Sequence, residues 1–324
     1  MVTIKDVAKQ AGVSVSTVSY VLSGDDRISP VTKKKVLDMA NLLNYAGKSG
    51  KKAENKEKIV AAYFHSIDGK FYASLLDALQ KVFSAHGYEL FVHLGEQIAP
   101  HNWIRGMIFL NSQISDEKIE ELAKSGTPIV LMDRELPGKN IQNIIIDNFD
   151  GQYTITKKVL KMGAKKIVYV GGMASSYDSS MRYEGYRQAL LEEQMPLSDM
   201  FFVRGDFTYK SGAEAAGFIL NTKGIPDAFI CANDEMAMGV VDFLKSQNIA
   251  VPDSVIVSGF DGFLLESADD YNCLTAYAEH HSWGNTAAYS LIELMDHDLK
   301  NPEKLVLPVR VNDIKTCSLN LNAI

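Results

Sequence analysis

Short apolar runs alternate with longer amphipathic stretches over residues 59–324. The apolar runs suit strands that are buried on both faces of a parallel sheet. The predicted strands are Ile59–Phe64, Tyr88–His93, Gly106–Leu110, Ile129–Met132, Ile144–Ile146, Lys166–Val170, Ala228–Cys231 and Val255–Gly259. The helices predicted between them include Phe71–His86, Asp116–Ser125, Gly151–Met162 and Arg182–Gln194. This alternation predicts an α/β body with parallel sheets.

Residues 1–46 show a purely helical pattern instead. Thr3 and Asp6 have the spacing of a capping box, and Gly12 is placed to end the helix that follows. Ser14 can cap a second helix, from Val15 to about Leu22. Two short helices joined by a glycine-containing turn predict a helix-turn-helix in an all-α head.

A third helix is predicted to start at Ser29-Pro30, since proline loses no hydrogen bond at the first helical position. Its apolar face is predicted to consist of Val36, Leu37, Ala40 and Leu43, which follow helical spacing.

The second helix is rich in small hydroxyl side chains, namely Ser14, Ser16, Thr17 and Ser19. Such residues are poor helix formers, but they suit contacts to phosphates and base edges in a DNA major groove. The alternative is a surface helix that contacts no DNA bases.

Charge divides the chain in the same way. The whole sequence carries a net charge of −7, yet residues 1–58 hold 11 Lys/Arg against 6 Asp/Glu, and the remainder is strongly acidic. A basic head on an acidic body indicates that only the head approaches a polyanion. Residues 47–58 are polar, lysine-rich and glycine-containing, which is typical of a flexible linker.

Polar residues follow several predicted strands of the body. Asp147 and Asn148 follow one strand, Asn233 and Asp234 another, and Asp261 a third. Ligands of α/β proteins bind at the carboxyl ends of strands, so these residues are candidate ligand contacts. Each of them could instead cap the next helix.

The remaining composition excludes several classes of protein. Cys231, Cys273 and Cys317 lack zinc-site spacing and fit a reducing cytoplasm, and no metal or cofactor is predicted. No signal peptide and no membrane-length apolar segment is found, so we expect a cytoplasmic protein without membrane contact.

The segment Thr3–Leu22 resembles the DNA-binding head of the lac-repressor (LacI/GalR) family, and the resemblance extends to Tyr45. It implies that Val15, Ser16 and Tyr20 read bases of double-stranded DNA. The predicted DNA-binding set is completed by Thr3, Ser14, Thr17 and Ser19.

The resemblance continues through the body, at Asp147-Asn148, Gly171-Gly172, Arg182–Tyr186, Gly205–Phe207, Ala232–Gly239 and Gly259–Asp261. It implies a fold similar to periplasmic sugar-binding proteins, with two α/β lobes around a cleft. The expected lobes are about 59–148 with 279–305, and about 149–278 with 306–324.

Effector contacts are also implied by this resemblance. Asp147, Arg182, Asn233 and Asp261 would bond hydroxyls of a sugar-like ligand. Phe207 would stack on the ligand, while Phe71 and Tyr72 would close the other lobe. The alternatives are a structural ion pair for Arg182 and plain core packing for Phe207.

Three features depart from the family pattern. The linker lacks the leucine-containing hinge segment that inserts into the minor groove in relatives. The chain between Leu94 and Gly106 is short, which predicts a truncated helix there. Glu279-His280-His281 stands where relatives often carry a Gln-Pro or Gln-Asp segment. Adjacent histidines should point to different sides, which argues against a metal site and leaves a contact at the rim of the ligand site as an alternative.

Taken together, these features predict a homodimeric transcriptional regulator, most often a repressor in this family, which binds a pseudo-palindromic operator under control of a sugar-like effector. Three rivals remain: an extracytoplasmic sugar-binding protein, an α/β enzyme, and an architectural DNA-binding protein. The first leaves the head unexplained. The second lacks a phosphate-binding motif, because the sequence around Gly171-Gly172 matches neither the GxGxxG pattern nor the GxxxxGK(S/T) pattern of nucleotide-binding loops. The third would show little sequence preference.

Overall fold

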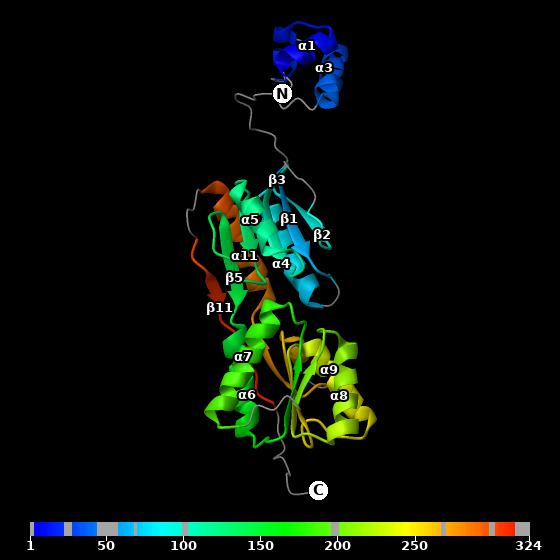
Figure 1. Cartoon of the computed structure of the whole chain (residues 1–324), viewed down its shortest axis with the longest axis vertical. Coiled ribbons are helices and arrows are strands. Elements are labelled where there is room, and N and C mark those ends of the chain that lie inside the picture. Colours follow the sequence, from blue (N-terminus) through cyan, green and yellow to red (C-terminus); the bar gives the residue numbers. More distant parts are fainter. Residues whose placement is uncertain are drawn as a thin grey trace. The chain divides into compact units, whose positions relative to one another are not determined.

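The computed structural model describes residues 3–22, 28–43, 58–67, 70–98, 103–195, 201–266, 270–297 and 302–314. The chain divides into two compact units, Met1–Glu57 and Lys58–Ile324, the head and the body (Figure 1). Most of the predicted linker and Cys317 lie outside the described residues.

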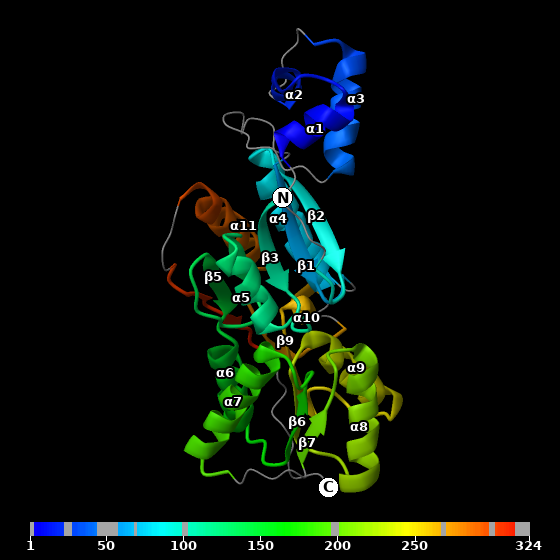
Figure 2. The ribbon, with the colours of Figure 1, turned by 45° about the horizontal axis from the view of Figure 1, so that its top comes forward.

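The head contains the three predicted helices, α1 (Ile4–Ala11), α2 (Val15–Leu22) and α3 (Pro30–Leu42) (Figure 2). The Asp6 carboxylate accepts hydrogen bonds from the Thr3 backbone N–H at 2.8 Å and from the Thr3 hydroxyl at 2.7 Å. Gly12 ends α1 in the left-handed conformation, with φ of 62°. The sequence signals for the start and the end of α1 are therefore confirmed.

Small residues build the head core. Its buried members are Val7, Ala8, Ala11, Val18, Val21, Val36 and Ala40. Leu37 is 46% exposed, so its predicted place on the apolar face is wrong. Val36 and Ala40 are four residues apart and therefore lie on the same, buried face of the helix. Leu37 comes one residue after Val36, so its side chain points away from that face.

The body contains two six-stranded sheets. The first has the order β11-β5-β4-β3-β1-β2, and all of its pairs are parallel. Its strands are β1 (Ile59–Phe64), β2 (Glu89–Leu94), β3 (Ile104–Leu110), β4 (Ile129–Leu131), β5 (Ile141–Ile146) and β11 (Leu305–Leu307). The predicted parallel architecture is confirmed.

The second sheet has the order β12-β10-β9-β8-β6-β7, in which only β12 runs antiparallel to its neighbour. Its strands are β6 (Ile167–Gly171), β7 (Phe202–Arg204), β8 (Ala228–Cys231), β9 (Ile256–Phe260), β10 (Leu274–Tyr277) and β12 (Arg310–Val311). We call the units built on these sheets the first lobe and the second lobe.

Four strands were not predicted: β7, β10, β11 and β12. Three of them are strands of two or three residues at sheet edges with partly exposed side chains, and so short a segment does not stand out as a buried strand. The fourth, β10, is interior, but Thr275 interrupts its apolar pattern.

Helices cover both faces of each sheet. In the first lobe α4 (Lys70–Ala85) packs beside α11 (His280–Asp296), while α5 (Asp116–Lys124) covers the opposite face. In the second lobe α6 (Asn148–Lys161) pairs with α7 (Tyr177–Glu192), and α8 (Tyr209–Lys223) pairs with α9 (Asp234–Ser246). The short α10 (Phe263–Glu266) follows β9.

Two helices of the second lobe begin earlier than predicted because serine and aspartate caps precede them. Asp147 accepts a hydrogen bond from the Asp150 N–H, so α6 begins at Asn148. Ser176 accepts one from the Ser179 N–H, so α7 begins at Tyr177.

The described residues between β2 and β3, 95–98 and 103, contain no helix, whereas a truncated helix was predicted for this segment. Within the described ranges, no helix has the length and apolar character of a membrane span.

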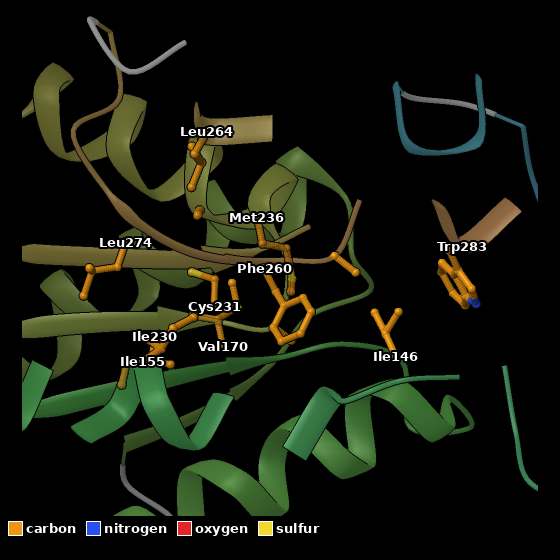
Figure 3. Close-up of a cluster of buried hydrophobic side chains, with 14 of the residues drawn as sticks. Ile146, Ile155, Val170, Ile230, Cys231, Met236, Phe260, Leu264, Leu274 and Trp283 are labelled. Atoms are coloured by element: carbon orange, nitrogen blue, oxygen red, sulfur yellow. The ribbon is translucent and has the colours of Figure 1, made fainter. Parts of the chain in front are cut away.

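The core of the second lobe reaches toward the first. Figure 3 shows Phe260 among Val170, Cys231 and Met236, with Ile146 and Trp283 beyond it. The Trp283 indole N–H donates to the Ile144 carbonyl at 2.8 Å, which fixes α11 to β5. The core packing and this hydrogen bond thus hold the carboxyl ends of the central strands in place.

Candidate functional site

The second helix of the head presents one buried face and one exposed face. Val18 and Val21 are buried, whereas Val15 is 41% and Tyr20 is 47% exposed. Large apolar side chains at this exposure are available to base edges, and a valine can contact a thymine methyl group.

The hydroxyl groups of α2 form a local network at its start. Ser14 Oγ accepts a hydrogen bond from the Thr17 N–H at 3.0 Å, so it caps the helix as predicted. It also lies 2.8 Å from Ser16 Oγ and 2.7 Å from Thr17 Oγ1. Ser16 and Ser19 are exposed, and Thr17 is half-buried.

Thr3 lies at the start of α1 and not on α2. Its hydroxyl donates to Asp6, so a capping role accounts for this residue. The structure therefore places every other predicted DNA contact on α2 or at its cap.

Arg182, on α7, connects several elements of the second lobe. Its Nε donates to Asn148 Oδ1 at 2.8 Å, and its Nη1 donates to the Ala232 carbonyl at 2.5 Å. Its Nη2 lies 3.4 Å from Asp261 Oδ1, and the guanidinium stacks 3.8 Å above the Phe260 ring. With 4% of its surface exposed, Arg182 joins the start of α6 to the ends of β8 and β9.

Asp261 follows β9 in a strained backbone conformation, with φ of 112°. Such strain in a residue other than glycine is concentrated at binding sites, where the surrounding structure imposes it. Burial raises the pKa of Asp261 to about 7, against the opposing effect of the Arg182 guanidinium.

Asp178 also belongs to this network, and the sequence did not indicate it. It lies in the first turn of α7 and accepts a hydrogen bond from Asn148 Nδ2 at 2.8 Å. Burial raises its pKa to about 6, although the Arg182 guanidinium favours the charged form. The signal was lost because the helix was predicted to start only at Arg182.

Tyr72, on α4 of the first lobe, faces these acidic residues. Burial, and to a lesser degree the negative charges of Asp261, Asp178, Asp133 and Glu235, together raise its pKa to about 12. Asp133 follows β4 of the first lobe, so carboxylates from both lobes raise the pKa of the Tyr72 hydroxyl. We call Tyr72, Asn148, Asp178, Arg182 and Asp261 the interlobe site.

Phe71 lies beside this site in an aromatic cluster. Its ring centroid is 5.0 Å from that of Tyr72, 5.1 Å from His280 and 5.9 Å from Trp283. His280 also stacks on Phe263 of the second lobe at 5.0 Å, so this cluster spans both lobes.

The two adjacent histidines point to different sides, as predicted. His280 contacts the aromatic cluster, while His281 is exposed, with Nδ1 3.8 Å from Asp77 Oδ2. Among the residues that the structure describes, no group of three or more potential ligands is arranged to hold a metal ion.

Asn233 and Phe207 are brought together in the second lobe, and Asn233 directly follows Ala232, whose carbonyl accepts from Arg182. Asn233 caps α9 by accepting from the Met236 N–H at 3.0 Å, and its Nδ2 donates to the Phe207 carbonyl at 2.9 Å. Phe207 is half-buried with φ of 71°, and its ring packs against Gly172 so closely that a Cβ on that glycine would overlap it. Both residues thus have structural roles at the ends of β7 and β8.

Asp147 is the predicted effector contact with the clearest structural role, since its side chain caps α6. No contact joins it to Arg182 in the described residues. Of the predicted set, direct contacts therefore join Arg182 and Asp261, together with Asn148 and Asp178, while Tyr72 is linked to them by the carboxylate charges that act on its hydroxyl.

A second connection joins the lobes at the start of α7. The Tyr177 hydroxyl donates to Glu135 Oε1 at 2.5 Å, and Lys304 Nζ lies 2.9 Å from the same oxygen. These hydrogen bonds hold the pKa of Glu135 below its usual value. These bonds link the start of α7 in the second lobe to the segments after β4 and before β11 in the first.

Both the head and the body match known protein families. Residues 56–316 match the family described as periplasmic binding proteins and sugar binding domain of LacI family, and residues 3–47 match bacterial regulatory proteins, lacI family. The chain is 28% identical to catabolite control protein A of Priestia megaterium, over 96% of this chain and 97% of that protein. It is 30% identical to the probable HTH-type transcriptional repressor ExuR of Bacillus subtilis (strain 168), over 81% and 82% of the two chains.

Solved structures show the same architecture. The transcriptional regulator CelR in complex with cellobiose superposes with a TM-score of 0.71 at 25% identity, covering 97% of this chain and 99% of that one. The lac repressor dimer bound to operator and the anti-inducer ONPF gives a TM-score of 0.68 at 24% identity, covering 98% and 99%. The latter likeness concerns the fold alone.

Proposed function

Because the chain belongs to the LacI family of bacterial regulatory proteins, we propose that it is a repressor that binds a pseudo-palindromic operator as a homodimer and responds to a sugar-like effector held between its lobes. As a family member it is a DNA-binding transcriptional regulator and not an enzyme.

The observation that carries the proposal is the exposed face of α2. Val15, Ser16 and Tyr20 project from a helix that is fixed to the head core by Val18 and Val21. A rigid helix with an exposed set of apolar and hydroxyl groups suits direct reading of base edges. Lys5, Lys9 and the lysines of α3 supply the positive charge that attracts the DNA backbone.

We expect a homodimer because one head alone is small. A single helix-turn-helix buries too little surface to specify one site in a genome, and family relatives meet this need by pairing two heads on a two-fold symmetric site. A dimer is present in the lac repressor structure on its operator.

The interlobe site supports the effector part of the proposal. Its polar groups come from both lobes, and the solved regulator CelR holds cellobiose. An effector that contacts Tyr72 and Arg182 together favours one relative position of the lobes, which biases the equilibrium between two states.

Fluorescence anisotropy tests the proposal. The purified full-length chain is titrated onto a palindromic duplex from upstream of its own gene, and onto a scrambled duplex, over a range of salt concentrations. We expect a clear preference for the palindrome at physiological salt. Tyr20→Ala should reduce this preference by roughly tenfold, as loss of a base contact of 1–3 kcal/mol implies.

Leu37→Ala is the matched control, because it removes an apolar side chain of similar exposure from α3. Equal binding to both duplexes, lost as salt rises, would mean that the head supplies only electrostatic affinity. That outcome favours the architectural protein over the repressor.

A further inference from the structure

A cavity of about 410 Å³ lies in the second lobe between α7 and the strands β6 and β7. These strands lie side by side at one edge of the second sheet (Figure 2). The lining of the cavity includes Tyr169 of β6, Ser179, Tyr183 and Glu184 of α7, and Phe202 and Arg204 of β7. No residue of the interlobe site lines it. A volume of this size is typical of sites for small molecules.

Tyr169 brings to this cavity a polar group that the fold does not use. It is fully buried, and its hydroxyl has no hydrogen-bond partner among the described residues. A buried tyrosine hydroxyl is usually paired, because burial without a partner costs free energy. An oxygen of a ligand in the cavity would accept the hydrogen bond that Tyr169 can donate.

Ser179 supplies a second buried hydroxyl beside it. This residue is 4% exposed, and its Oγ accepts a hydrogen bond from the Gly172 N–H at 3.1 Å. Among the described residues, no acceptor receives the O–H of Ser179. The buried side of the cavity thus offers two hydroxyl donors, and a ligand with an acceptor oxygen at that end would suit them.

Aromatic rings form one wall of the cavity. The ring centroids of Tyr169 and Phe202 are 6.0 Å apart with an interplanar angle of 19°, and the Tyr183 ring lies 5.3 Å from the first and 5.1 Å from the second. Tyr183 and Phe202 are only half-buried. An apolar planar ring can pack on this wall. A sugar would find too few polar partners here for a hydroxyl on nearly every ring carbon.

The exposed side of the cavity carries a positive charge. Arg204 is exposed, its guanidinium lies 5.0 Å from the Phe202 ring centroid, and no carboxylate in the described ranges lies within 4.0 Å of its nitrogens. Glu184 is already engaged, because Arg187 Nη1 donates to both of its oxygens at 3.0 Å. A ligand carboxylate would therefore meet a guanidinium without a counter-charge, and a ligand amine would meet no free acid.

We propose that this cavity is a second binding site, separate from the interlobe site, for an aromatic carboxylate whose ring carries a hydroxyl group. The ring packs on Tyr183 and Phe202, the carboxylate binds Arg204, and the ring hydroxyl accepts from Tyr169. This inference goes beyond the proposed function, because it depends neither on a sugar-like effector nor on DNA.

Ligand-observed NMR titration of the full-length chain tests the proposal. The probes are para-hydroxybenzoate, para-hydroxyphenylacetate and para-hydroxyphenylpropionate, which place the carboxylate at three distances from the same ring. Each is compared with its amide and with the acid that lacks the ring hydroxyl. For the acid whose length fits the cavity, we expect roughly fivefold tighter binding than for either of its two analogues.

Two variants assign the two polar contacts. Arg204→Gln should bring the affinity ratio of acid to amide close to one. Tyr169→Phe should bring the ratio of hydroxylated to unsubstituted acid close to one, without lowering the stability of the body, because the hydroxyl has no partner to lose. Lys223→Gln is the matched control, since it removes an exposed positive charge at the end of α8 in the same lobe, and it should retain both ratios.

The inference would be overturned if no acid of the three bound, if acid and amide bound equally, or if Arg204→Gln left their ratio unchanged. An equal loss in Lys223→Gln would also overturn it, because the acid would then respond to overall charge and not to the cavity. A destabilised Tyr169→Phe would show that the hydroxyl serves the fold and not a ligand. Operator preference is measured separately, so each of these results leaves the proposed function standing.

Discussion

The head and the body place their candidate binding residues in opposite environments. In the head, Val15 and Tyr20 are 41% and 47% exposed, and the core beneath them uses other residues. In the body, Arg182 is 4% and Asn233 is 7% exposed, and each also holds strand ends or a helix start in place.

This difference follows from the ligands that the two units are built to meet. Duplex DNA is too large to enclose, so it must be read by side chains that project from a surface. A small effector is bound by groups that surround it, and such groups are part of the packed interior. Binding and stability should therefore be separable in the head and coupled in the body.

The largest effect is expected for Arg182→Ala. Loss of the guanidinium leaves Asp261 without its ion-pair partner and Asn148 Oδ1 without a donor inside the body. Removal of one partner from a buried ion pair costs about 3–5 kcal/mol of unfolding free energy. Both tryptophans of the chain, Trp103 and Trp283, lie in the body, so tryptophan fluorescence during urea unfolding reports this unit alone.

Arg187→Ala is the control for this substitution. Arg187 lies on the same helix with 38% of its side chain exposed, and it pairs with Glu184 three residues away. Such a surface pair contributes no more than about 0.5 kcal/mol. Equal stability of the two variants would show that the Arg182 network binds ligand without supporting the fold.

A smaller effect, confined to the head, is expected for Val18→Ala. Val18 is fully buried in a core of valines and alanines, so loss of two methyl groups should cost about 2 kcal/mol. Operator affinity should then disappear at a lower temperature, while the tryptophan-monitored unfolding of the body stays unchanged. Val31→Ala, at a position that is 79% exposed on α3, should alter neither property. A parallel loss of body stability would contradict the independence of the two units.

The same contrast explains which parts of the structure the sequence could predict. The head is governed by contacts between near neighbours, such as Thr3 with Asp6 and Ser14 with Thr17. These signals are local, and so all three helices could be read from spacing and capping residues. The error at Leu37 arose because apolar character alone does not say which side of a helix is buried.

The interlobe site depends on contacts that are distant along the chain. Arg182 meets Asn148 across 34 residues, and Asp178 meets the same asparagine across 30. The pattern of polar residues after strands predicted Asp261, but Asp178 stands at a helix start whose cap, Ser176, was overlooked. Only the packing of α6 against α7 brings these side chains together.

The smallest effect is expected for Asp6→Asn. Asp6 is a charged residue of the head whose hydrogen bonds are local, since they join it only to Thr3, three residues away. Hydrogen bonds from the Thr3 hydroxyl and backbone hold the pKa of the Asp6 carboxyl below its usual value. A depressed pKa in the folded state stabilises the head above the unfolded value near pH 4, and this contribution is lost as the pH falls through the folded value. Far-UV circular dichroism of the head transition should show a lower melting temperature for Asp6→Asn at pH 7, with the difference shrinking as the pH falls below the unfolded value. Asp38→Asn, an exposed change on α3, should track the unaltered chain throughout. A difference that stayed constant as the pH was lowered would mean that the carboxylate charge is irrelevant and that the shape of the cap alone secures the start of α1.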